Sequence, residues 1–508
     1  MNNVVVRNIE FEKALWHLLD AIRGKIDNSH LHRYILPILF LKYISDDWHI
    51  RRADLAARLD NETLIDRRMQ RGRFILPEAA NFNALQKTAK PDLSRAINNA
   101  LILLEQANQH KLAGLFKNID YNSPLLSGAP DKVWMDFLDG LIRLAGGTDF
   151  STHMEDIFPW VLSFSPVVSP GNTNYYFTPD TLADLLVKLI MPKAGDRIYD
   201  PSCNFGKLLI KAADAVTDDH GNRSEDFSLF GQGISDEMTR YLRMYMIMRN
   251  LDDARIVSND PIRNPIRTAG EQLLKFDVLL SNLPWNIENW GIQEAKMDPD
   301  KRFQWGIPPE KKGDWAYIQH MLAVASDKGR VAVIVPHGLL FREGRELLIR
   351  KAVVENNLLE AVISLPLNLF YSTKLPCAIL LFNKNKAKNK NTLFIDASKE
   401  FKAEKRQHSL REEDINHILS AWNCFRKNPN EAEKSLELNY SVVVTIKTIA
   451  ANNYNLNVSR YIKQLNNEDS PAIDIHALKA ELDSLNNQLM TIRTSILHQF
   501  SQLGVKVK

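Results

Sequence analysis

The segment that decides the fold of this 508-residue chain is the one at 276–285, which reads Phe276-Asp277-Val278-Leu279-Leu280-Ser281-Asn282-Leu283-Pro284-Trp285. An apolar run that passes directly into a polar residue, a proline and an aromatic residue is typical of a buried strand ending in a turn. Further short apolar runs alternate with helical patterns, at 197–199, 229–231, 331–335, 359–365, 377–382 and 392–395. The alternation predicts an α/β fold with a mostly parallel, doubly wound sheet.

Helical patterns flank this sheet. Apolar residues recur at helical spacing from Phe11 to about Leu144, and a stretch rich in Pro, Ser, Gly and Asn ends that pattern near residue 165. Near the carboxyl end, leucines and isoleucines recur in steps of four and three from Leu478 to Ile496. This seam favours a coiled coil, although a helix packed on its own domain remains the alternative. We therefore predict a helical domain at 1–165, a Rossmann-like domain at 166–465 and a coiled-coil tail at 470–508.

The composition indicates a folded chain and excludes several classes of protein. Lys and Arg (64) barely outnumber Asp and Glu (61), so any surface for nucleic acid must be local. The three cysteines, Cys203, Cys377 and Cys424, form neither a metal-ligand spacing nor a disulfide framework. No apolar run is long enough to span a bilayer, and the amino-terminal residues lack the order of a signal peptide. We expect a cytoplasmic protein with no metal site and no membrane partner.

The first candidate site is the turn Tyr199-Asp200-Pro201-Ser202-Cys203-Asn204-Phe205-Gly206-Lys207-Leu208-Leu209. It follows a predicted strand and opens a helix, which is where doubly wound sheets bind ligands. Such a turn lets the backbone approach a nucleotide-like ligand, but a plain structural turn explains it equally well. Pro201 and Leu208 exclude a Walker phosphate loop, which needs Gly and Ser or Thr at these positions.

The second candidate site is the turn after the strand at 276–281, and its groups suit chemistry on an exocyclic amine. The lone pair of the adenine amino group is delocalised into the ring, so two oxygens must accept its hydrogens as a methyl group arrives. Asn282 and the carbonyl of Leu283 supply such oxygens. Pro284 biases the backbone of Leu283 toward an extended conformation. Trp285 offers a face on which a flipped base stacks, whereas by itself it would be interpreted as a core aromatic residue.

Together the two turns resemble the amino-methyltransferase motifs of the modification subunit of type I restriction-modification systems. The resemblance covers nearly the whole chain and includes the segments at 176–179, 335–341, 363–373 and 394–398. It implies S-adenosylmethionine-dependent methylation of adenine N6 in DNA, as part of phage defence. It also implies four kinds of partner: double-stranded DNA, a specificity subunit, a restriction or other effector subunit, and a second copy of the chain. The helical domain and the tail would then contact DNA or partners and assemble the subunits.

The same resemblance implies roles for individual residues. Those implied to bind the cofactor are Tyr176, Thr178, Pro179, Asp200, Asn204, Gly206, Gly233 and Asp260. Those implied to be catalytic are Asn282, Leu283, Pro284 and Trp285. Asp260 corresponds to the position that contacts the adenine of the cofactor.

Three of these positions depart from the family pattern. Asn204 replaces the first glycine of the cofactor turn, Gly233 replaces the acidic residue that binds the ribose hydroxyls, and Leu283 replaces the first proline of the catalytic turn. Losing hydrogen bonds to a charged group costs roughly 1.5–3 kcal/mol each. Two hypotheses follow: a working adenine-N6 methyltransferase, or a degenerate subunit kept as a DNA-binding and assembly scaffold.

Overall fold

The structure is a computed structural model that describes residues 9–22, 31–122, 131–148, 154–162, 178–370, 374–386, 391–404, 407–427, 429, 437, 439–462, 479 and 482–492. The chain divides into two compact units, Met1–Ile462 and Lys463–Lys508. The predicted domain boundary near residue 165 lies outside the described residues. Among the helices that are described, none is long and apolar enough to cross a membrane.

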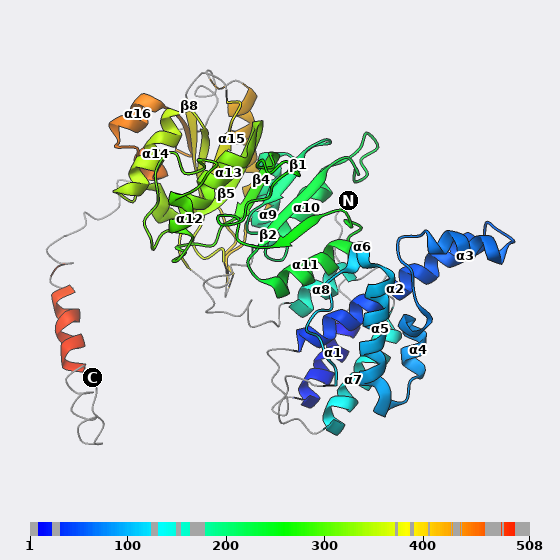
Figure 1. Ribbon diagram of the computed structural model, residues 1–508. Coiled ribbons are helices and arrows are strands. Elements are labelled where there is room, and N and C mark those ends of the chain that lie inside the picture. Colours follow the sequence, from blue (N-terminus) through cyan, green and yellow to red (C-terminus); the bar gives the residue numbers. More distant parts are fainter. Residues whose placement is uncertain are drawn as a thin grey trace. The chain divides into compact units, whose positions relative to one another are not determined.

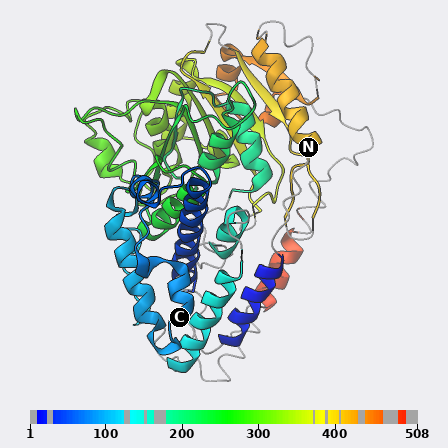
Figure 2. The same ribbon diagram turned by 90° about the vertical axis from the view of Figure 1, so that its right-hand side faces the viewer.

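The centre of the first unit is a β-sheet (Figures 1 and 2). It has nine strands in the order β3-β2-β1-β4-β5-β7-β6-β8-β9. Its strands are β1 (Arg197–Asp200), β2 (Ser228–Gly233), β3 (Arg255–Ser258), β4 (Phe276–Asn282), β5 (Ala325–Pro336), β6 (Leu359–Ser364), β7 (Cys377–Asn383), β8 (Asn391–Asp396) and β9 (Ser441–Thr445). β1 to β5 pair in parallel, and β6 pairs in parallel with β8. β7 and β9 are antiparallel to their neighbours. The predicted mostly parallel α/β fold is confirmed.

Helices cover both faces of the sheet, which explains why its strands are continuous apolar runs. Val278 and Leu280 of β4 pack into the core on the side of α9 (Asp180–Ile190), α10 (Lys207–Ala215) and α15 (Glu412–Lys427). Leu279 points to the other face, toward α13 (Asp314–Val324), α14 (Arg345–Glu355) and α16 (Ile446–Ala451), with α12 (Ile292–Lys296) beside them. The edge strands β3 and β9 were not predicted, because short edge strands lack a long apolar run.

The amino-terminal region is helical, as predicted. Its helices are α1 (Ile9–Ile22), α2 (His32–Ala56), α3 (Glu62–Gln70), α4 (Phe82–Lys87), α5 (Leu93–Ala107), α6 (Gln109–Leu112), α7 (Asp131–Gly146) and α8 (Met154–Leu162). A helix of the α/β region, α11 (Asp236–Met248), completes their core, because Met238, Tyr241 and Met244 belong to the same buried cluster as the core residues of these helices. α11 therefore joins the helical region to the sheet.

Polar contacts reinforce this junction. Arg33 of α2 donates to the Glu237 carboxylate of α11, with 2.8 Å between Nη2 and Oε2. The Nε2 atom of His32 lies 3.4 Å from the same carboxylate, and the Tyr241 hydroxyl donates to it at 3.0 Å. Burial opposes the ionisation of Glu237, but the contact with His32 and the hydrogen bonds from Arg33 outweigh burial and lower the pKa of Glu237 to about 2.

The second unit contains a helix over 482–492. Leu482, Leu485, Leu489 and Ile492 are all more than half exposed, so the apolar seam of this helix is open to solvent in the single chain. Apart from residue 479, the rest of the predicted tail, including Leu478 and Ile496, lies outside the described residues. Formation of a coiled coil stays a prediction.

The contacts of Glu237 predict how the junction responds to mutation and pH. Glu237→Gln should lower the free energy of unfolding by about 2 kcal/mol at pH 7. Because the carboxyl pKa is lower in the folded protein, this contribution is complete above the unfolded pKa of about 4.3 and is lost as the pH falls toward 2. Urea unfolding of both proteins at pH 7 and pH 3 measures the effect.

A matched control is Glu62→Gln. Glu62 also pairs with an arginine, Arg52, but its side chain is 75% exposed. This substitution should change stability by less than about 0.5 kcal/mol. A Glu237→Gln deficit that is equally large at pH 3 would contradict the assignment.

Candidate functional site

The predicted site residues lie along the carboxyl ends of four neighbouring strands. Gly233, Asp200 and Asn282 are the last residues of β2, β1 and β4, and Asp260 follows the end of β3 by two residues. The strand order β3-β2-β1-β4-β5 reverses direction between β1 and β4. Ligands of doubly wound sheets bind at such a switch point. Tyr176, which is also a predicted cofactor residue, lies outside the described residues.

A small pocket, whose empty space of about 300 Å³ includes open solvent, lies at this switch point. Its lining residues are Thr178, Asp200, Ser202, Cys203, Asn204, Phe205, Lys207, Leu208 and Asn282. The structure therefore brings together the first turn, the second turn and Thr178, which directly precedes the amino-terminal cap of α9, Pro179. Gly233 and Asp260 do not line this pocket.

The first turn adopts a left-handed backbone at two positions. Asn204 has a φ of 42° and Gly206 a φ of 69°. Asparagine is one of the few side chains that tolerate this region, so the turn forms without the glycine of the family pattern. Gly206 is also required by packing, because a Cβ atom there would lie 2.2 Å from Leu242 Cδ1 of α11. The helix that joins the two regions thus packs directly against the pocket turn.

Asp200 is the buried acid of the pocket, with 2% of its surface exposed. Its Oδ1 accepts hydrogen bonds from Ser281 Oγ at 2.7 Å and from the Ser202 backbone N–H at 2.9 Å. Burial raises the pKa of Asp200 to about 7, although both hydrogen bonds act in the opposite direction. The carboxyl therefore changes its charge near neutral pH.

Lys207 is a functional candidate that the sequence analysis missed, although it stands inside the quoted turn. Its ammonium lies 3.0 Å from the Asp180 carboxylate at the start of α9. Burial lowers the pKa of Lys207, and Asp180 partly opposes this shift. A pocket that holds both Asp200 and Lys207 suits a ligand with an ammonium and a carboxylate group, such as the free end of an amino acid.

The second turn presents its amide to the pocket and its apolar side chains to the core. Asn282 is 4% exposed, and its Nδ2 donates to Thr178 Oγ1 at 3.2 Å. Leu283 is buried in the core on the α13 face. Trp285 is 5% exposed and meets Phe370 edge-on, with 5.1 Å between ring centroids. Trp285 therefore occupies the core position that was its alternative interpretation, and stacking on a base stays a prediction.

Gly233 and Asp260, two cofactor candidates outside the pocket, differ in the groups that they present. A Cβ atom at Gly233 would lie 3.2 Å from Thr239 Oγ1 and 3.9 Å from Cys203 Sγ, so a side chain there fits after a small shift. The Asp260 carboxylate accepts from the Ile262 N–H at 2.8 Å and from the Arg263 guanidinium. Asp260 is thus already paired within its own loop.

Two family models match the chain, one over the helical region and one over the α/β region. The family model of the HsdM N-terminal domain matches residues 11–140, and that of N-6 DNA Methylase matches residues 151–470. The type I restriction enzyme MpnII methylase subunit of Mycoplasma pneumoniae is 26% identical over 96% of this chain and 94% of its own length. The MjaVII methylase subunit of Methanocaldococcus jannaschii is 32% identical over 71% of this chain and 63% of its own length.

Solved structures show the same fold. A type I restriction-modification methyltransferase subunit from Streptococcus thermophilus superposes with a TM-score of 0.76, at 24% identity, over 90% of this chain and 99% of that one. The N-6 DNA Methylase model by itself spans more than half of the chain. The chain therefore belongs to the N-6 DNA methylase family, in which it is a modification subunit of the type I restriction-modification kind.

Proposed function

We propose that this chain transfers a methyl group from S-adenosylmethionine to adenine N6 in double-stranded DNA. The observation that carries the proposal is the pocket at the strand switch point, where Asn282 meets the turn that contains Asp200. The scaffold hypothesis gains no support, because the turn forms around Asn204 and the pocket retains charged groups.

The chemistry of the pocket fits the amino-acid end of S-adenosylmethionine. The ionised form of Asp200 would hold the ammonium group, and Lys207 would hold the carboxylate. The other end of the cofactor finds fewer partners, because Gly233 has no side chain and Asp260 is paired with Arg263. We therefore expect S-adenosylmethionine to bind, with the ribose as its weakest point of attachment.

The residues of the second turn would then act on the adenine. When bound, S-adenosylmethionine supplies an electrophilic methyl group. The amide oxygen of Asn282 and the backbone carbonyl of Leu283 accept the two amino hydrogens of a flipped adenine, which directs the nitrogen lone pair toward the methyl group. The hydrogen bond between Asn282 and Thr178 fixes the rotation of the amide. Phe370 must move before Trp285 exposes a face to the base.

The wider assembly is part of the proposal. A specificity subunit would select the DNA target, and a restriction or other effector subunit and a second copy of this chain would complete a cytoplasmic defence complex. The helical region at 1–165 would contact DNA or partners, while the tail at 470–508 would assemble subunits through its seam. The exposed apolar residues of the helix over 482–492 support the role of the tail.

The first test is the binding of S-adenosylmethionine and its dependence on pH. Calorimetric titration of the chain, alone and with its specificity subunit, should show binding whose affinity is greatest at about pH 7 to 8, where Asp200 is ionised and the ammonium group of the ligand still carries its proton. Below pH 7 the affinity should fall by up to about tenfold per pH unit, because Asp200 must lose its proton before it can hold the ammonium group. Asp200→Asn should bind weakly at every pH.

The control for this titration is Asp184→Asn, which removes a carboxylate that pairs with Lys211 outside the pocket. It should leave both the affinity and the pH profile unchanged. Absence of binding at any pH, even with the specificity subunit, would refute the enzymatic proposal.

The second test separates catalysis from cofactor binding. Asn282→Ala should lower methyl incorporation into DNA by about 100-fold or more, because one of the two acceptors is lost. Its affinity for S-adenosylmethionine should change by less than about threefold, and Thr178→Val should have an intermediate effect on methylation. Adenine-methylation mapping of host DNA with each variant checks the result in the cell. Unchanged methylation by Asn282→Ala would exclude the assigned role.

The third test restores the missing ribose contact. Gly233→Glu should tighten S-adenosylmethionine binding roughly ten- to hundredfold, because it returns charged hydrogen-bond acceptors to the end of β2. Gly233→Ala is the control for added volume, since its Cβ meets only Thr239 closely. If Gly233→Glu binds S-adenosylmethionine no more tightly than Gly233→Ala, a carboxylate at this position makes no contact with the ribose.

A further inference from the structure

A buried chain of polar side chains lies behind the pocket, on the α13 face of the sheet. Its members are Arg302, His320, Tyr199 and Gln232, and we call these four residues the polar relay. Each is at most 4% exposed. None of them lines the pocket, and Tyr199 belongs to the core cluster of the α13 face.

The hydrogen bonds of the polar relay have one consistent direction. The guanidinium of Arg302 can only donate, so His320 Nδ1, at 3.0 Å, accepts and the imidazole proton sits on Nε2. That N–H donates to the Tyr199 hydroxyl oxygen at 3.1 Å, and the hydroxyl donates to Gln232 Oε1 at 2.6 Å. Burial, assisted by Arg302, holds the pKa of His320 well below its usual range, so the neutral form persists.

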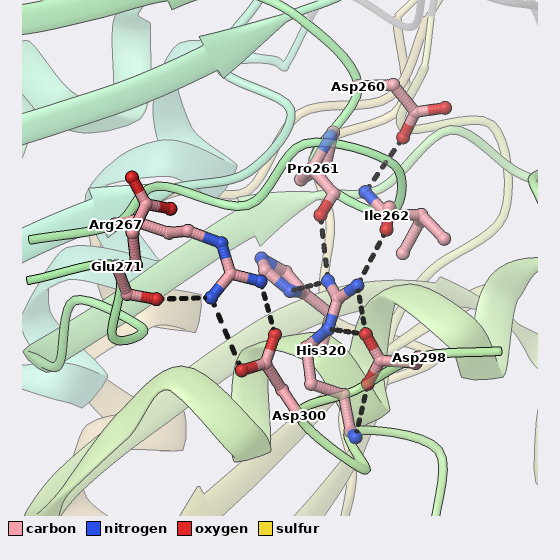
Figure 3. Close-up of polar contacts among 9 residues, drawn as sticks. Asp260, Pro261, Ile262, Arg267, Glu271, Asp298, Asp300 and His320 are labelled. Carbon is pink, nitrogen blue, oxygen red and sulfur yellow. Dashed lines mark hydrogen bonds and ion pairs between the residues drawn. The ribbon is translucent and has the colours of Figure 1, made fainter. Parts of the chain in front are cut away.

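Both ends of the polar relay hold the loop over 259–264, which carries Asp260. Gln232 Nε2 donates to the Asn259 side chain and to the Asn264 carbonyl, the latter at 3.0 Å. At the other end, Arg302 donates to the carbonyls of Pro261 and Ile262 at 2.9 and 2.7 Å (Figure 3).

The loop is therefore held against a fixed support. Asp298 anchors the guanidinium of Arg302 with contacts of 3.0 and 2.7 Å. In Figure 3, Pro261 and Ile262 contact the guanidinium of Arg302 from one side, and Asp298 and His320 contact it from the other.

The relay also reaches the other two cofactor segments. Tyr199 directly precedes Asp200, and Gln232 directly precedes Gly233. Because side chains alternate along a strand, Tyr199 points away from the side on which Asp200 lines the pocket, and Gln232 points away from the side that a side chain at Gly233 would take. The relay thus connects the ends of β1 and β2 and the loop after β3 from behind.

We propose that the polar relay positions the segments of the cofactor site, and that Arg302, at one end of the relay, contributes most to this positioning. It sets the spacing of the three segments that carry Asp200, Gly233 and Asp260, so cofactor affinity depends on a guanidinium that touches no cofactor. This inference rests on the proposed function for its ligand, S-adenosylmethionine. Lysine cannot replace Arg302, because a single ammonium cannot reach both loop carbonyls, His320 and Asp298 at once.

The test compares two neighbouring arginines in the full-length chain with its specificity subunit. Arg302→Lys should weaken S-adenosylmethionine binding at least about tenfold, while turnover at saturating cofactor stays within about threefold of the wild type. Arg267→Met is the matched control. Figure 3 also draws Arg267, whose partners there are Asp300 and the Glu271 carbonyl rather than the loop. Its affinity should change less than about twofold.

A second readout does not require the cofactor. Hydrogen exchange of the backbone amides over 259–264 should accelerate in Arg302→Lys and stay unchanged in Arg267→Met. If the wild type binds no S-adenosylmethionine, the proposed function fails. The exchange rates then test by themselves whether the relay holds the loop over 259–264 in place. If Arg302→Lys does not fold, Tyr199→Phe, which removes one oxygen, takes its place. It should also weaken S-adenosylmethionine binding and accelerate exchange over 259–264, with effects severalfold smaller.

Three results would overturn the inference. The first is an Arg302→Lys protein that binds the cofactor as tightly as the wild type. The second is an equal weakening of S-adenosylmethionine binding by Arg302→Lys and Arg267→Met, which would mean that both substitutions act through general stability. The third is unchanged exchange over 259–264 in the relay variants.

Discussion

The parallel pairing of β1 with β4 is the contact on which the site depends. Ile198 pairs with Val278 and Tyr199 with Leu279, so the two strands end at the same edge of the sheet. Their next turns then meet, and Ser281 Oγ donates to the buried Asp200 carboxylate at 2.7 Å. Because strand order reverses here, no crossover helix fills the space above these ends, and the pocket occupies it.

The three departures from the family pattern have different structural consequences. Asn204 adopts the left-handed backbone that the turn needs, so its effect is confined to the side chain. Leu283 is absorbed by the core and keeps its backbone carbonyl beside Asn282. Gly233 alone removes a group that nothing nearby replaces, since Asp260 is held by Arg263. In the proposed function, the loss would therefore fall on the binding of the ribose rather than on the whole site.

The helix α11 makes the helical region part of the same mechanical unit as the pocket. One side of it contributes Met238 and Tyr241 to the core of the amino-terminal helices. Leu242 lies close to Gly206 of the pocket turn, and Glu237 is held by Arg33 of α2. α11 therefore contacts both the core of the amino-terminal helices and the turn that lines the pocket.

The amino-acid sequence by itself determined the fold class and the two turns. Continuous apolar runs predict buried parallel strands, and the residues of each turn are consecutive in the chain, so both signals are local. Only the tertiary structure decided the environment of the side chains in those turns. The pKa of Asp200 near 7 results from burial, the core position of Trp285 depends on contact with Phe370, and Lys207 becomes a pocket residue through folding. Arg302 and His320 carry no local signal, because they reach the cofactor segments only through hydrogen bonds between distant parts of the chain.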